Sequence, residues 1–156
     1  MGSLRRTGSR AVFGRAAGVA AAMVGLGVAG VLAAPAAGAA GPPCGPEARA
    51  CVSLGGNAAW LMDGGAVTYG PVPITTGRKG YATPTGTFHV TYRDIDHYSR
   101  AFNGPMPYSV FFTTSGVAFH QGSLKVKSHG CVHLSKEAAR TFYDGLAPGD
   151  VVQVVA

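Results

Sequence analysis

Apolar and alternating positions beyond about residue 40 follow the pattern of a β-protein. Two short apolar runs precede the turn signal Asp63-Gly64-Gly65, and extended chain resumes after it, which predicts a hairpin. Period-two alternation and β-branched runs predict three further strands. The expected strands are 51–54, 58–62, 66–69, 87–92, 109–113 and 151–155.

One segment near the C-terminal end has helical signals instead. Ser135 is a suitable N-cap, Glu137 falls in the first turn, and Gly145 can end the helix. The segment 94–107 is polar and contains glycine and proline, so we predict a loop that forms a cleft wall, with Arg93, Asp94, Asp96 and His97 as a surface ion cluster. The fold class indicated is mainly β, a β-sandwich or flattened barrel with one late α-helix.

The first 39 residues have the pattern of an export signal rather than of a folded domain. Four arginines precede the apolar, Ala- and Gly-rich stretch 16–34, and Ala37-Gly38-Ala39 offers a cleavage site. We therefore expect a leader at 1–39, one domain at 40–156, and an exported protein of the cell wall or extracellular space. The alternative is a retained anchor, but so many alanines and glycines make a poor span. The export route, general or twin-arginine, stays open.

Removal of this leader changes the charge argument. The whole chain has a formal net charge of +6, but the four arginines of the leader leave with it. The remaining Lys and Arg barely outnumber Asp and Glu, so composition gives no support to nucleic-acid binding.

The three cysteines divide into a pair and a single residue. Cys44 and Cys51 lie early in the exported part, and an oxidising compartment favours a disulfide between them. Cys131 is then left as the free thiol.

Cys131 lies among three histidines, in Ser128-His129-Gly130-Cys131-Val132-His133 with His120 upstream. A thiol attacks acyl carbon as the thiolate, so a neighbouring imidazole indicates a nucleophile with its base. An extended segment 129–133 would point alternate side chains the same way. A hairpin through 121–127 would instead bring His120 beside Cys131.

Two other interpretations of this cluster stay open. Cys131 can be an inert buried residue among hydrogen-bonded histidines. The same residues can also ligate zinc, although His-x-Cys-x-His on one strand closes a tetrahedron poorly. We predict neither a metal nor a cofactor.

The chain resembles a known family at these residues, the L,D-transpeptidases of bacterial cell walls (the YkuD-like catalytic domain). That family has an upstream His and then Ser/Thr-His-Gly-Cys, here His120 and Ser128 to Cys131. The stretch Thr83-Pro84-Thr85-Gly86-Thr87-Phe88 also resembles its Thr-Pro-x-Gly-x-Phe/Tyr turn. Many members have Arg or Asn where this chain has His133, and the link from His120 to Ser128 is short.

The resemblance implies the same β-sandwich fold and a cysteine acyltransferase acting on peptidoglycan stem peptides. The donor would be a tetrapeptide stem cut before its terminal D-Ala, and an acceptor amine would complete a 3→3 cross-link. The expected roles are Cys131 as nucleophile, His120 as proton donor and acceptor, the backbone N–H groups of Gly130 and Cys131 as oxyanion donors, His129 and Ser128 as supporting catalytic residues, and His133, Gln121 and Tyr108 as substrate contacts.

Three other functions remain for comparison. Water as the acceptor would make the protein an L,D-carboxypeptidase. A secreted thiol endopeptidase would share nucleophile and base, but the papain-like signature is absent. A non-catalytic wall-binding module would not need Cys131. The sequence does not indicate the acceptor, the stem chemistry or the oligomeric state.

Overall fold

The computed structural model describes residues 41–156, so the predicted leader lies outside the described residues. Nine strands and one helix make up this part. Their bounds are β1 Ala50–Ser53, β2 Ala58–Asp63, β3 Ala66–Pro73, β4 Gly86–His89, β5 Tyr92–Ser99, β6 Gly104–Phe111, β7 Ala118–Gln121, β8 Val132–Leu134, α1 Lys136–Gly145 and β9 Val151–Val155. The fold is mainly β with one late helix, as the sequence predicted.

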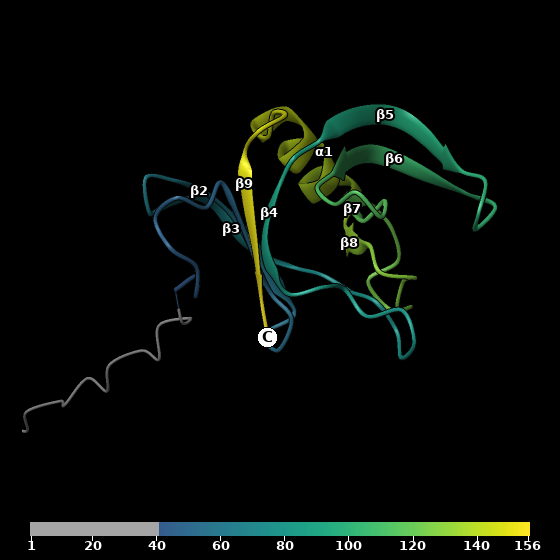
Figure 1. Ribbon diagram of the computed structural model, residues 1–156, viewed down its shortest axis with the longest axis horizontal. Coiled ribbons are helices and arrows are strands. Elements are labelled where there is room, and N and C mark those ends of the chain that lie inside the picture. Colours follow the sequence, from purple (N-terminus) through teal and green to yellow (C-terminus); the bar gives the residue numbers. More distant parts are fainter. Residues whose placement is uncertain (1–40) are drawn as a thin grey trace, which may run out of the picture. The chain divides into compact units, whose positions relative to one another are not determined.

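The strands form two sheets, which are shown in Figure 1. The five-stranded sheet has the order β3-β2-β1-β9-β4, and the four-stranded sheet has the order β5-β6-β7-β8. The predicted hairpin is the antiparallel pair β2–β3, which turns at Gly64 and Gly65, both with positive φ. The predicted closing strand β9 lies between β1 and β4, parallel to β1 and antiparallel to β4.

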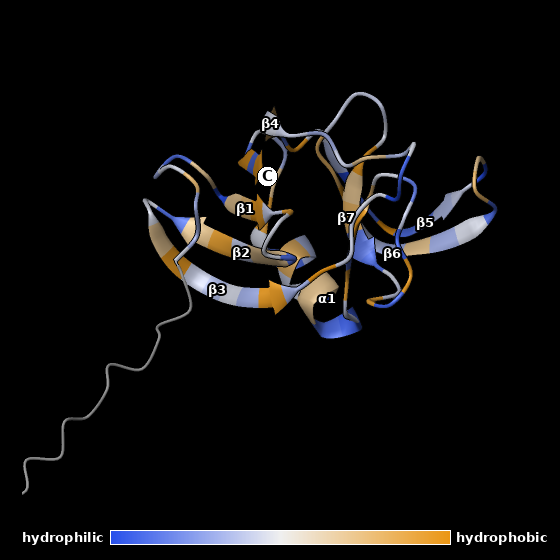
Figure 2. Cartoon of the chain, turned by 90° about the horizontal axis from the view of Figure 1, so that it is seen from below, coloured by the Kyte–Doolittle hydropathy of each residue, from blue (hydrophilic) through white to orange (hydrophobic). Residues whose placement is uncertain are grey.

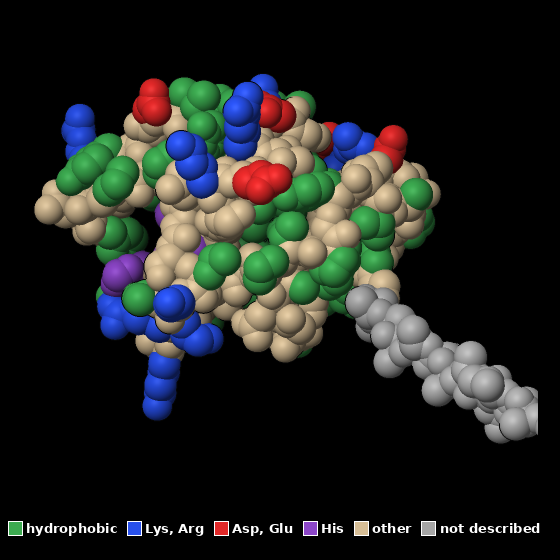
Figure 3. All heavy atoms as spheres, turned by 180° about the vertical axis from the view of Figure 1, so that it is seen from behind, with side chains coloured by type: hydrophobic (Ala, Val, Ile, Leu, Met, Phe, Trp, Pro, Cys, Tyr) green, Lys and Arg blue, Asp and Glu red, His purple; other side chains and the backbone are tan. Residues whose placement is uncertain are grey.

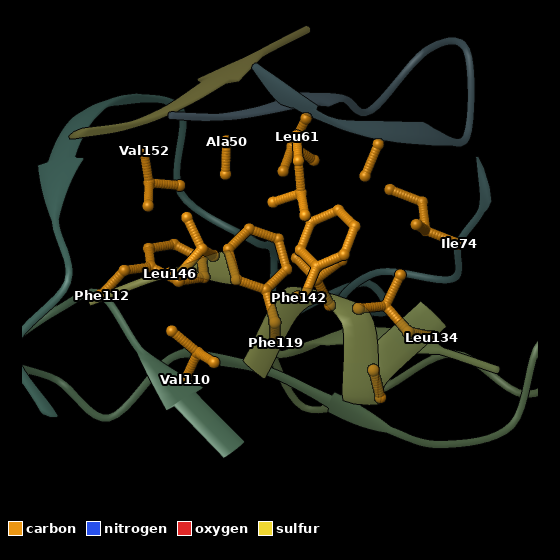
Figure 4. Packing of buried hydrophobic residues seen from close by; sticks show 14 of the residues in the cluster. Ala50, Leu61, Ile74, Val110, Phe112, Phe119, Leu134, Phe142, Leu146 and Val152 are labelled. Carbon is orange, nitrogen blue, oxygen red and sulfur yellow. The ribbon is translucent and has the colours of Figure 1, made fainter. Parts of the chain in front are cut away.

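The main core lies between the two sheets (Figure 4). Ala50, Leu61 and Val152 of the five-stranded sheet point towards Val110 and Phe119 of the four-stranded sheet. Helix α1 adds Ala138, Ala139 and Phe142, and the Phe142 ring lies 5.1 Å from that of Phe119. Burying large aliphatic and aromatic side chains in this way contributes about 1.5–3 kcal/mol each.

The helix has the termini that the sequence predicted. The Ser135 side chain accepts a hydrogen bond from the Ala138 N–H, and the helix ends at Gly145. Its buried positions Ala138, Ala139 and Phe142 face the core, because residues three and four apart share one side of a helix.

The four-stranded sheet has two different faces. Val110, Phe119 and Val132 point into the main core, and we call this side the core face. Their neighbours alternate to the opposite side, where Phe111, Ala118, His120 and His133 lie; we call it the site face. Hydrophobic colouring dominates β1 and β2, whereas β5 is mostly hydrophilic (Figure 2).

Two sequence predictions about these strands are wrong. The segment 94–107 is not a loop, because β5 and β6 pair antiparallel as a long hairpin from Tyr92↔Phe111 to Ser99↔Gly104. The strands that carry His120 and His133 do not form a hairpin either. β7 and β8 are parallel, with Phe119 opposite Val132 and His120 opposite His133.

The predicted disulfide is present, between Cys44 and Cys51. Cys51 packs with Ala48, Trp60 and Met62 in a small cluster separate from the main core. Within residues 41–156, no helix is long and apolar enough to cross a membrane.

Candidate active site

The turn that carries Cys131 is held from two sides. On one side, β8 pairs with β7. On the other side, Thr75 and His133 exchange backbone hydrogen bonds, and the Arg78 N–H donates to the Ser128 carbonyl. The segment 75–78 therefore lies along the motif, which places it at the edge of the site although it is some fifty residues away in sequence.

The turn itself needs Gly130 and Ser128. Gly130 has φ +118, in the region that favours glycine, so a side chain here would strain the backbone. The Ser128 hydroxyl donates to the Cys131 carbonyl at 2.5 Å and accepts from the Gly130 N–H at 3.0 Å. Ser128 thus fixes the backbone of the turn on both sides of Gly130.

Thr83 connects the second sequence motif to this turn. Its hydroxyl donates to the Gly130 carbonyl at 2.8 Å and accepts from the Gly77 N–H at 2.9 Å. The side chain is buried. The sequence placed Thr83 in the Thr-Pro-x-Gly-x-Phe/Tyr motif without indicating a role for it. In the structure, its two hydrogen bonds join that motif to the turn that carries Cys131.

A pocket of about 160 Å³ gathers most of the predicted site residues. Cys131, His120, His129, His133 and Ser128 all line it. Most of the other lining residues belong to the segment 94–107, which was predicted to form a cleft wall, and one comes from the loop before the motif: Ser99, Phe102, Gly104, Pro105 and Met106, with Lys127. The tip of the hairpin therefore forms the pocket wall that had been expected from a loop.

His120 is buried, and its ring orientation is fixed by the backbone. Its Nδ1 lies 2.7 Å from the Gln121 carbonyl oxygen. A carbonyl only accepts, so Nδ1 carries the hydrogen and Nε2 of the neutral ring is the acceptor. Burial, and after it the charge of His133, lowers the pKa of His120 to about 4, against a smaller opposing effect of the Gln121 hydrogen bond. The ring is therefore neutral at neutral pH.

Cys131 is partly buried and lines the pocket. It is the free cysteine, because the other two form the disulfide. Burial raises the pKa of the Cys131 thiol, and a hydrogen bond with the Ala118 backbone opposes this effect. Its Sγ lies 3.9 Å from the Gly116 carbonyl oxygen, and among the described residues no hydrogen bond joins it to His120. Thiol and imidazole are thus both neutral at rest, and catalytic hydrogen bonds often tighten only when substrate is bound.

The other two histidines have separate partners. His133 Nδ1 lies 3.1 Å from the Ser123 carbonyl and 3.2 Å from Thr75 Oγ1, and its ring meets the His120 ring edge-on at 4.8 Å. A side chain at Gly122 would collide with the His133 ring, since its Cβ would lie 2.5 Å away. His133 is therefore held as a wall of the pocket beside His120.

His129 lies in an exposed aromatic and basic group at the rim. Arg78 donates to its Nε2 at 2.8 Å, the Phe102 ring stacks on it at 4.3 Å, and the Tyr81 ring meets it edge-on at 4.9 Å. Because an arginine can only donate, His129 Nε2 is an acceptor here. Figure 3 shows Lys and Arg side chains gathered beside a histidine at one corner of the molecule.

Three predicted site residues have other surroundings than expected. Tyr108 has φ +58, packs edge-on against Tyr143 at 6.2 Å and does not line the pocket, so its predicted substrate contact is not supported. Gln121 does not line the pocket either and acts on the site through its carbonyl. The Gly130 N–H, predicted as an oxyanion donor, already donates to Ser128 Oγ.

Zinc binding was one of two alternatives to a nucleophile at this cluster. In residues 41–156, no group of three or more His, Cys, Asp or Glu side chains is arranged to hold a metal ion. The cluster around Cys131 is instead accounted for by separate hydrogen bonds of each histidine.

Known proteins resemble this chain in sequence and in structure. Residues 47–154 match the model of the YkuD family, described as the L,D-transpeptidase catalytic domain. A curated relative, L,D-transpeptidase 1 of Mycobacterium tuberculosis, is 29% identical over 103 residues, which cover 54% of this chain and 41% of the relative. The match thus spans less than half of the relative's length.

Solved structures agree with the fold. The crystal structure of an L,D-transpeptidase from Stackebrandtia nassauensis is 29% identical, with a TM-score of 0.65, covering 69% of this chain and 54% of that chain. The crystal structure of M. tuberculosis L,D-transpeptidase 1 is 27% identical, with a TM-score of 0.57, covering 67% of this chain and 59% of that chain. Since the family model matches more than half of the sequence, the chain belongs to the L,D-transpeptidase catalytic domain (YkuD) family.

Proposed function

We propose that this protein is a peptidoglycan L,D-transpeptidase with Cys131 as its nucleophile. The observation that carries the proposal is the convergence of Cys131, His120 and His133 in one pocket, with the His120 tautomer fixed by a backbone carbonyl. Membership of the family supports the reaction class. By that resemblance, the donor is a tetrapeptide stem that ends in D-Ala.

In the first step, Cys131 Sγ attacks the carbonyl carbon of the L-centre as its proton moves to His120 Nε2. The neutral resting pair favours transfer during attack rather than a preformed ion pair, since the pKa of Cys131 is raised and that of His120 is lowered. The C–N bond to D-Ala then breaks, and His120 returns the proton to the leaving amine. A thioester on Cys131 remains.

In the second step, an acceptor amine attacks the thioester carbon and the C–S bond breaks. The proton of the amine passes through His120 Nε2 to the departing Cys131 Sγ. The new C–N bond is the 3→3 cross-link, and water in place of the amine would give a tripeptide. Of the two expected oxyanion donors, we propose the Cys131 N–H, because the Gly130 N–H already donates a hydrogen bond to Ser128 Oγ and would have to break it. Ser128 and His129 act by holding the turn and the pocket rim, and His133 by contacting substrate beside His120.

The test is an incubation of the full chain with disaccharide-tetrapeptide, with products identified by mass spectrometry. We expect a dimer with loss of D-Ala, no turnover in Cys131→Ala, almost none in His120→Ala, and a milder loss in Ser128→Ala. His89→Ala is the matched control for the histidine, because His89 is exposed on β4 and outside the pocket.

Each other outcome identifies a different function. Tripeptide without dimer would indicate an L,D-carboxypeptidase. Unchanged tetrapeptide with retained binding to wall polymer would indicate the non-catalytic module. An active Cys131→Ala protein would contradict the mechanism.

We also propose that the protein is exported and acts at the cell wall. The Cys44–Cys51 disulfide supports this, because such bonds persist in oxidising compartments. Fractionation of cells, with intact-mass analysis of the exported chain, tests both the location and the cleavage after residue 39.

A further inference from the structure

Four basic side chains gather on two neighbouring loops beside the pocket. Arg78 and Lys79 belong to one loop and Lys125 and Lys127 to the other, and all four residues are exposed. The loops lie side by side, because the Arg78 N–H donates to the Ser128 carbonyl at 3.0 Å. We call these four basic residues the basic corner.

The basic corner belongs to parts of the chain without acidic residues. The sequence has no Asp or Glu in 64–93 or in 97–136. Within residues 41–156, the ion pairs of Lys and Arg involve only Arg49 and Arg140. On the face that Figure 3 shows, Lys and Arg side chains likewise gather at one corner, and the acidic side chains lie elsewhere. The basic corner therefore presents four positive charges to solvent.

Apolar side chains are exposed between these charges. On the second loop, Val126 is 65% exposed and Leu124 is 37% exposed. Hydrogen bonds fix this loop: the Ser123 hydroxyl accepts from the N–H groups of Lys125 and Val126. The Thr75 hydroxyl also donates to the Ser123 carbonyl at 2.6 Å. The loop thus holds alternating apolar and basic side chains in solvent.

The combination of charge and apolar surface distinguishes between two anionic partners. Exposed cations attract any polyanion, including an anionic polymer of the cell wall, but such a polymer would leave Leu124 and Val126 in water. The surface of an anionic bilayer accommodates both kinds of side chain. Its phosphate headgroups attract the cations, and the boundary with the acyl chains takes up the apolar groups.

We propose that the basic corner, together with Leu124 and Val126, docks the protein on the surface of an anionic membrane. The contact is peripheral and is made by the side chains of two loops. Lys127 and His129 line the pocket, so docking brings the pocket close to the headgroups. Docking requires no group that transfers a proton or an acyl chain, and it therefore goes beyond the proposed acyl transfer.

The test measures the binding of residues 41–156 to lipid vesicles. Both sheets, the main core and the disulfide lie within this part, so it folds on its own. Omission of the predicted leader keeps its apolar stretch out of the measurement. One set of vesicles contains equal parts of phosphatidylglycerol and phosphatidylcholine, and the other contains phosphatidylcholine alone. Sedimentation gives an apparent Kd for each.

The first variant tests the charges. Lys79→Gln with Lys125→Gln removes two charges that do not line the pocket. Lys136→Gln with Arg140→Gln removes two charges from α1 and is the matched control. All four side chains are exposed, so both variants should stay folded.

We expect the wild type to bind anionic vesicles at least about 10-fold more tightly than neutral ones. Loss of the two lysines of the basic corner should weaken this binding about 25-fold, since each charge near the surface contributes about five-fold. The control should bind almost as tightly as the wild type. Equal binding to the two kinds of vesicle, or equal losses in the two variants, would overturn the proposal.

The second variant tests the apolar contact. Val126→Ser should weaken binding to anionic vesicles about 10-fold, because serine gains little from burial at the acyl boundary. Val67→Ser is the control, since Val67 is 44% exposed on β3, and it should change nothing. Soluble poly(glycerol phosphate) serves as the competing polyanion. If Val126→Ser binds vesicles as the wild type does and the polymer competes fully, the basic corner binds anionic wall polymers and the membrane proposal is wrong.

Discussion

Phe119 and His120 are neighbours on β7, and both are buried, but their surroundings have nothing in common. Phe119 on the core face packs against the Phe112 and Phe142 rings, at 4.8 and 5.1 Å. His120 on the site face has a carbonyl, a second histidine and a pocket around it. Strand alternation thus lets one short strand contribute to the core on one side and to the candidate active site on the other. The two faces should therefore respond differently to substitution.

The largest expected effect on stability comes from the core face. Phe119→Ala removes a fully buried ring between two others and should lower the free energy of unfolding by about 3–5 kcal/mol. Cys131→Ala on the site face should lower the free energy of unfolding by much less, although it should abolish the proposed activity. Urea denaturation of both variants measures the contrast, and equal losses would show that the two faces are not separable.

A loss of stability below neutral pH should arise from His120. Its pKa is lowered to about 4 in the folded protein, against about 6.5 in the unfolded chain, so the unfolded state binds the proton first. The contribution of neutral His120 to the free energy of unfolding is complete above pH 6.5. It declines as the pH falls towards 4, by roughly 3 kcal/mol in total. Denaturation at several pH values tests this, and His120→Gln should remove that part of the decline. A profile unchanged by the substitution would assign it to other groups.

Ser128→Ala should lower both stability and activity, because the Ser128 hydroxyl lies in the candidate site and also holds the backbone of the turn. Loss of its bonds to the Gly130 N–H and the Cys131 carbonyl should cost about 1–3 kcal/mol. The rate of acylation should fall while the wild-type pH profile is kept, since no proton-transfer group is removed. Ser128→Thr retains the hydroxyl and should recover part of both. A variant with full stability and reduced acylation would instead indicate direct contact with substrate.

The smallest effect is expected at the exposed rim. Phe102→Ala removes the ring stacked on His129. It should lower the free energy of unfolding by at most about 0.5–1.5 kcal/mol, because both rings are exposed to solvent. A double-mutant cycle with His129→Ala measures the coupling. The same cycle on Phe119 and Phe142 gives the reference for the core. A coupling energy at the rim as large as that reference would contradict the distinction between rim and core.

The sequence predicted best those features that depend on neighbours in the chain. The cap at Ser135 and the end at Gly145 are local signals, and the histidines around Cys131 are close in sequence. The β5–β6 hairpin was missed because Pro105 and Pro107 suggested a loop. Pairing with β7 involves only Val110 and Phe111, so the proline half of β6 has one neighbour and tolerates missing N–H groups.

The features that were missed depend on segments far apart in the chain. A short polar link after His120 suggested a hairpin, but the segment 75–78 pairs with the far side of the motif, and β8 joins β7 in parallel. The contacts of Thr83 with Gly130 and of Arg78 with His129 arise from the same packing. No local pattern encodes such partners, since each requires the whole sheet to be in place.

The position of the disulfide has a consequence for the thiol of Cys131. Cys44 and Cys51 are separated by 7 residues, whereas Cys131 is 80 residues beyond Cys51. The entropy of loop closure favours the short ring over the long one by roughly 2 kcal/mol. In an oxidising environment, chain entropy therefore favours pairing of Cys44 with Cys51 over pairing of either with Cys131. The disulfide thus leaves Cys131 as the free thiol that the proposed mechanism requires.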